Sequence, residues 1–150
     1  MRGRSSGVRP ASTSCSVRST RSRRAEAVAT YPDARAGVRA LLKPLGATYY
    51  VLTTDFAKSL PAFLVYATGG SERFPFREDR ITVQAYADGS TAAHKAAERA
   101  RAVLAGGPRD GVGDTVLDQV EVEVVPVEVP QYEGQPAMVT ATYRVQTRAL

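Results

Sequence analysis

The segment RITVQAYADGSTAAHKAAERARAVLAGG, residues 80–107, constrains the fold more than any other part of this sequence. Over its first eight residues, Arg80, Thr82, Gln84 and Tyr86 alternate with an apolar set, Ile81, Val83, Ala85 and Ala87. Successive side chains of a β-strand point to opposite faces. The alternation therefore predicts a strand that lays one face on a core and leaves the other face polar.

A helix is expected directly after this strand. Asp88-Gly89 predicts a turn, and Ser90 or Thr91 is the expected N-cap. The apolar side chains that follow recur at helical spacing and are nearly all alanine: Ala92, Ala93, Ala96, Ala97, Ala100, Val103 and Leu104. Because alanine is small, such a helix can lie close against a sheet. The GGP sequence at 106–108 predicts its end.

One further helix and four further strands are expected. The helix should run from about Pro32 to Lys43 with Thr30 as its cap. The strands should span 47–55, 62–70, 115–130 and 137–150. In the last of these, one face should carry Val139, Ala141, Tyr143 and Val145.

Glycine and proline mark the expected interruptions of these strands. Gly69-Gly70 should begin a polar connection that continues through Arg77, and the glycine-rich sequence GGPRDGVGD should be a loop. Pro126 predicts a bulge or a sheet edge. The order of elements predicts an α+β fold: a mixed or antiparallel sheet of about five strands, two helices packed on one face, and a long C-terminal hairpin. A single domain is expected over residues 30–150.

The charge is unevenly distributed along the chain. Residues 1–24 contain seven arginines and no acid, whereas the remaining residues carry thirteen Lys and Arg against fifteen Asp and Glu. Any argument for nucleic-acid binding therefore depends on the N-terminal segment, with Arg18, Arg21, Arg23 and Arg24 as the candidate contacts.

Residues 1–29 are rich in Arg, Ser and Thr and contain few large apolar side chains. This composition predicts an extension that is disordered on its own. The alternatives are an arm that orders against a neighbouring subunit or nucleic-acid phosphates and, after that, an organelle transit peptide. The absence of an apolar core segment excludes a secretory signal peptide.

Residues suited to catalysis are few and scattered. His94 is the only histidine and Cys15 the only cysteine, and the sequence places neither near a partner that would activate it. The glycine clusters match no phosphate-binding fingerprint. Glu121 and Glu123 are two apart on an expected strand and indicate a solvated face, and Asp114 and Asp118 lack further ligands at metal spacing. We therefore expect no enzyme activity, no metal and no cofactor. No apolar run approaches the length that spans a membrane.

Five features, over roughly residues 31–149, carry a resemblance to a known family. They are the leading helix YPDARAGVRALL, the strand PAFLVYATGG, the strand–helix unit DRITVQAYADGSTAAHKAAERARAVL, the proline-containing strand VEVVPVEVPQY and the closing strand MVTATYRVQTR. In this order they resemble the tail terminator proteins of siphophages that infect actinobacteria. The Arg-rich leader and the short first helix depart from that pattern.

The resemblance implies a structural virion protein without catalysis. Such proteins form a homo-oligomeric ring, usually a hexamer, on the head-proximal end of the tail tube. The ring ends polymerisation of the major tail tube protein, joins the tail to the neck connector and lets DNA pass through its lumen; it assembles in the host cytoplasm. The alternatives are another neck or tail-completion protein of the same fold, and a nucleic-acid-binding module that acts through the Arg-rich segment.

The expected function suggests where partners would bind. The candidate interface or lumen residues are Glu72, Arg73, Arg77, Glu121, Glu123 and Arg144. The first three lie in the expected 70–79 loop, and the others lie on the last two strands. An acidic lining formed by Glu121 and Glu123 would repel the phosphates of passing DNA.

Overall fold

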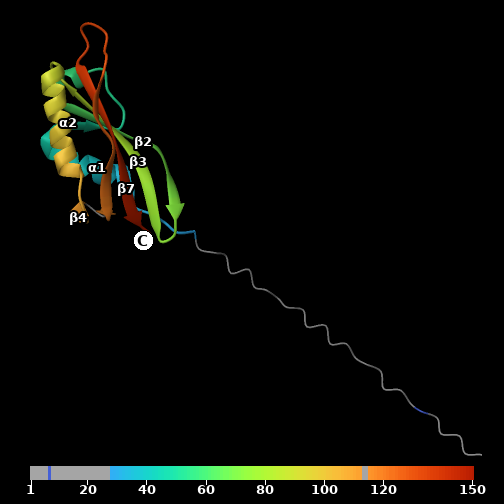
Figure 1. Cartoon of the computed structure of the whole chain (residues 1–150). Coiled ribbons are helices and arrows are strands. Elements are labelled where there is room, and N and C mark those ends of the chain that lie inside the picture. The colour runs from blue at the N-terminus through green and yellow to red at the C-terminus, as the bar shows by residue number, and fades with distance from the viewer. Residues whose placement is uncertain (1–6, 8–27, 113–114) are drawn as a thin grey trace, which may run out of the picture.

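The computed structural model describes Gly7, residues 28–112 and residues 115–150, with the backbone alone at 109–112. A five-stranded sheet forms one layer, and α1 (Ala34–Leu42) and α2 (Ser90–Leu104) form the other. Both helices cover the same face of the sheet (Figure 1). The predicted α+β fold is confirmed, with both helices on one face.

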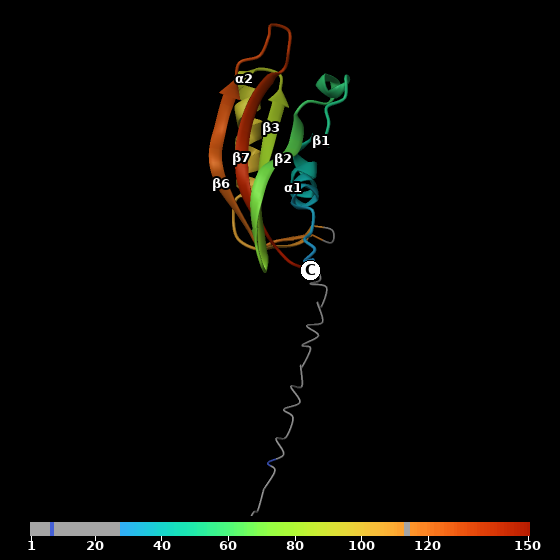
Figure 2. The same cartoon turned by 90° about the vertical axis from the view of Figure 1, so that its right-hand side faces the viewer.

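The sheet has the strand order β1-β2-β3-β7-β6. Its members are β1 (Ala47–Tyr49), β2 (Ala62–Arg73), β3 (Phe76–Ala87), β6 (Gln119–Val129) and β7 (Ala137–Arg148). The β1–β2 pair is parallel and the other pairs are antiparallel, so the sheet is mixed. Figure 2 shows the consequence: β1 and β6 lie at opposite sides of the sheet, and each has one neighbouring strand within it.

Four small elements complete the fold in the described residues. Two single turns of 3-10 helix, η1 (Lys43–Leu45) and η2 (Phe56–Ser59), flank β1. The short strands β4 (Arg109–Val112) and β5 (Thr115–Leu117) pair with each other. The sequence GGPRDGVGD is therefore not entirely a loop, because β4 begins within it.

The core lies between the two helices and the sheet. The alternating residues of β3 and β7 that were predicted to face it are buried: Ile81, Val83, Ala85, Ala87, Val139, Ala141, Tyr143 and Val145. Above them lie five buried residues of α2: Ala93, Ala96, Ala97, Ala100 and Leu104. Ala92 is exposed, so the predicted stripe is slightly too wide. Small side chains bring the helix backbone close to the sheet and avoid voids.

Both helices begin differently from the prediction. The N-cap of α1 is Asp33, whose Oδ1 accepts a hydrogen bond from the Arg35 amide at 3.0 Å, and not Thr30. A carboxylate at this position also complements the positive end of the helix dipole. α2 begins at Ser90 with Gly89 as its N-cap, so no side chain caps it, and the Ser90 hydroxyl donates to Glu128 Oε2 at 2.8 Å.

The second and third strands extend further than predicted. β2 continues through Gly69 and Gly70 to Arg73, and β3 begins at Phe76, so the expected 70–79 loop is a tight hairpin. A register shift lies at Thr68, between Ala67 and Gly69, where Gly69 has φ +129°. Glycine tolerates this backbone conformation, so the glycines permit a bulge within the strand and do not end it.

The first strand is shorter and the fourth is divided. β1 ends at Tyr49, because the chain then turns to place η2 on the helix-free face. The predicted strand 115–130 separates at Asp118, where β5 pairs with β4 and β6 with β7. The bulge predicted at Pro126 is confirmed by a register shift between Val124 and Val127, and β6 is also an edge strand.

Candidate interface surfaces

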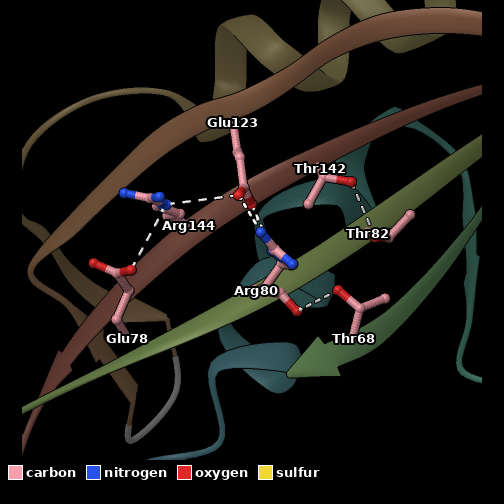
Figure 3. Close-up of polar contacts among 7 residues, drawn as sticks. All are labelled: Thr68, Glu78, Arg80, Thr82, Glu123, Thr142 and Arg144. Carbon is pink, nitrogen blue, oxygen red and sulfur yellow. Dashed lines mark hydrogen bonds and ion pairs between the residues drawn. The ribbon is translucent and has the colours of Figure 1, made fainter. Parts of the chain in front are cut away.

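A network of charged side chains crosses the helix-free face of the sheet (Figure 3). The Arg80 guanidinium donates to both carboxylate oxygens of Glu123, with Nε to Oε2 at 2.7 Å. Arg144 lies between two acids, 3.9 Å from Glu123 and 3.7 Å from Glu78. The network therefore connects β3, β7 and β6 with alternating charges.

Glu123 and Glu121 differ in role, although the sequence treats them as a pair. The hydrogen bond from Arg80 lowers the pKa of Glu123, and its side chain is only 17% exposed. Glu121 is exposed and accepts a hydrogen bond from Gln119 Nε2 at 2.6 Å. Glu123 thus anchors β6 to the sheet, whereas Glu121 remains available to a partner.

Neutral contacts occupy the middle of the same face. The hydroxyls of Thr82 and Thr142 lie 3.1 Å apart, and the Thr68 hydroxyl donates to the Arg80 carbonyl at 3.3 Å (Figure 3). Towards the end of the sheet near η2, the Phe56 and Tyr86 rings pack edge to face at 5.0 Å between centroids. The η2 segment covers that end, and the charged network lies beyond it on the same face.

The other three candidate residues lie on the β2–β3 hairpin. Glu72 is opposite Arg77, and Arg73 is opposite Phe76. Arg77 donates to Asp79 Oδ1 at 3.0 Å and lies 6.0 Å from the Tyr31 ring centroid.

The six candidates therefore do not form one site. Arg77 is four residues from the buried Ile81 on the same strand, so it lies on the helix-covered side of the sheet, as does its partner Glu72. Arg144, Glu121 and Glu123 lie together on the opposite side. The predicted lumen or interface set is thus divided between two faces.

A feature that sequence reasoning missed is the acidity of one sheet edge. Residues 110–143 contain seven acids and no Lys, Arg or His. We call β6 and the turn that follows it the acidic edge and define it by its exposed acids and apolar residues: Glu121, Glu128, Glu133, Val124, Val125, Val127 and Tyr132. A tally of charge in windows along the chain would have found it.

The opposite side of the molecule carries a small excess of basic side chains. Residues 33–72 contain four bases and three acids, and two of the bases are paired, Arg35 with Asp33 and Lys58 with Asp55. We call this surface the basic side and define it by Arg39, Lys43, Lys58, Tyr50 and Val51, all exposed. Arg39 donates to the Thr48 hydroxyl at 3.3 Å, and its guanidinium lies 4.7 Å from the Tyr50 ring centroid. These contacts hold its charge near β1.

Within the described residues, no group of three His, Cys, Asp or Glu could hold a metal ion. His94 lies 3.7 Å from Glu128 on the surface of α2. No helix in this part of the chain is both long and apolar enough to cross a bilayer. The candidate arm residues Arg18, Arg21, Arg23 and Arg24, and also Cys15, lie outside the described residues.

Comparison of the sequence with protein-family models and with curated proteins finds no match.

Proposed function

We propose that this protein is a structural subunit of a phage virion. In this proposal it forms a ring on the head-proximal end of the tail tube, ends tube polymerisation and joins the tail to the neck connector. Its partners are further copies of itself, the major tail tube protein and the connector. DNA passes through the ring without sequence-specific binding, and no cofactor takes part.

The observation that carries the proposal is the pair of dissimilar sheet edges. β1 and β6 lie at opposite sides of one sheet; acids without a basic partner lie along β6, and among the described residues Arg39 and Lys43 near β1 are cations without an acidic partner within 4.0 Å. Two different patches on opposite sides of a subunit can join copies head to tail. Head-to-tail contacts close into a ring when the rotation between neighbours allows it, which is the assembly that the tail-terminator resemblance implies.

The helix-free face supports the same assignment. Its residues Arg80, Arg144, Glu78 and Glu123 pair within the subunit, whereas Glu121 has no basic partner closer than 4.0 Å in the part of the chain that the structure describes. In the proposed ring, this face or the β2–β3 hairpin meets the tube or lines the channel. A carboxylate lining disfavours adhesion of DNA phosphates.

The experiment is assembly of the full-length chain with and without its tail tube protein. Mass photometry and negative-stain microscopy should detect closed rings, and rings should cap one end of the tubes and halt their growth. Binding to a neck connector but not to tubes would assign the protein to another station of the same assembly. A chain that stays monomeric at high concentration beside tube protein would contradict the proposal.

A further inference from the structure

We infer that the acidic edge of one copy docks against the basic side of the next copy. The inference deepens the proposed function, on which it rests for the identity of the partner, a second copy of this chain. It names the two surfaces that meet and the side chains that select them.

The acidic edge has charge that the subunit itself does not neutralise. Glu121 and Glu133 have no Lys or Arg within 4.0 Å among the described residues, and Glu128 contacts only Ser90 and His94. Between these acids lie Val124, Val125 and Val127, at 44%, 67% and 48% exposure. An edge strand with exposed valines is a surface that needs a partner or a means of repelling one.

Pairing of two acidic edges is disfavoured by their own charge. A symmetric contact between β6 strands would place the same acids of both copies close together, and like charges on opposed strands repel. Pro126 also removes a backbone donor, and two register shifts interrupt β6. These features select against a β6–β6 dimer and favour a basic partner.

The basic side meets this requirement on the same molecule. No carboxylate among the described residues lies within 4.0 Å of Arg39 or Lys43, so both cations are available. Val51, at 78% exposure, and Tyr50 supply apolar surface beside them. An interface with an apolar centre and complementary charges at its rim is the usual arrangement between subunits.

The placement of the two surfaces makes the contact head to tail. In Figure 2, α1 and β1 lie on one side of the sheet and β6 on the other, as the strand order requires. A copy that uses its acidic edge on one neighbour therefore still presents its basic side to another. This geometry lets a chain of copies extend and close.

Charge reversal tests the inference directly. The Glu121→Lys/Glu133→Lys variant makes both surfaces basic, and Arg39→Glu/Lys43→Glu makes both acidic. At about 50 mM salt, each variant alone should need at least about tenfold more protein to assemble than the native chain. An equimolar mixture of the two should assemble again, as should a single chain that carries all four substitutions. Mass photometry and analytical ultracentrifugation give the readout.

The matched control reverses two exposed cations of α2, Lys95→Glu/Arg99→Glu, and should assemble as the native chain does. If Arg39→Glu unfolds the protein, as judged by circular dichroism, Lys43→Glu/Lys58→Glu replaces that variant.

Assembly of either single-surface variant at native concentrations would overturn the inference. A native chain that never assembles would also overturn the inference. Loss of assembly when Arg18, Arg21, Arg23 and Arg24 are changed to Ser would overturn it too, because the N-terminal arm would then be the occupant of the acidic edge.

The outcomes separate this inference from the proposed function. Reversed variants that still form rings on tail tubes would overturn the inference and leave the function standing. Complementary assembly of the variants, together with a native chain that binds neither tube nor connector, would support the interface and contradict the function.

Discussion

At the scale of single residues, Tyr143 is the largest fully buried side chain. It lies under α2, and its hydroxyl has no hydrogen-bond partner among the described residues. Burial raises the pKa of this phenol to about 12, because the charged form would lose its hydration. The ring therefore contributes to packing, whereas the hydroxyl group contributes a cost.

We expect Tyr143→Phe to leave stability at pH 8 unchanged or raised by up to about 1 kcal/mol, because the ring stays and an unpaired buried hydroxyl is lost. Between pH 10 and 12 the unfolded chain releases the Tyr143 proton while the folded chain keeps it, so this residue lowers stability as pH rises. At pH 11 the variant should gain a further ~1 kcal/mol over the native chain. Urea denaturation at both pH values measures this.

Tyr132→Phe is the matched control, because Tyr132 is 89% exposed. It should show no such difference between the two pH values. A Tyr143→Phe variant that is much less stable than the native chain at pH 8 would mean that the hydroxyl has a partner in solution.

At the scale of elements, the sequence predicted strands where alternation is strong. β3 and β7 follow the alternation at 80–87 and 137–150, and α2 follows its alanine stripe. The alternation in β2 ends at its glycines, where the strand continues because β3 pairs with it as far as Arg73. Cross-strand pairing within this hairpin decided the strand length there, and local propensity did not.

The candidate site was predictable in part for the same reason. Glu123 and Arg144 were identified as candidates, but Arg80, which binds Glu123, lies 43 residues earlier in the chain. Cross-strand register brings these side chains together, and register is not visible in the spacing of residues within one segment. Register is also the reason why Glu72 and Arg77 lie on one face of the sheet and Glu121 and Arg144 on the other.

Gly70→Ala should destabilise the β2–β3 hairpin by roughly 1–3 kcal/mol. A Cβ at this position would lie 2.2 Å from the Glu78 carbonyl oxygen and 3.0 Å from the Asp79 Cα, both in the paired strand. Backbone atoms cannot move aside as a flexible side chain can, so the strands must separate. The midpoint of urea denaturation measures the loss.

Gly107→Ala is the control, because a Cβ there would meet nothing within 4 Å. It should leave the midpoint unchanged. If Gly70→Ala matched it, the close pairing of β2 through its glycines would not exist in solution.

At the scale of the whole molecule, the formal net charge of +5 conceals three distinct regions. The first 24 residues are strongly basic, residues 33–72 carry a small excess of bases, and residues 110–143 are entirely acidic in their charged side chains. Electrostatic steering acts through such local fields more than through the net charge. In the proposed assembly, attraction between copies and attraction to DNA would therefore belong to different parts of the chain.

This separation predicts how the full-length chain behaves with DNA. Replacing Arg18, Arg21, Arg23 and Arg24 by Ser should weaken non-specific DNA binding, because those side chains supply phosphate contacts. The slope of log affinity against log salt should fall by up to about 3.5, since each neutralised phosphate contributes ~0.9. Fluorescence anisotropy with duplex DNA over a range of salt concentrations measures both.

The assembly state should remain native, because the acidic edge and the basic side are unchanged. Native DNA affinity in this variant would place the phosphate contacts elsewhere, on Arg2, Arg4 and Arg9 or on residues after the N-terminal segment. Tight binding by the native chain, lost in the variant, would favour a nucleic-acid-binding module over the virion ring.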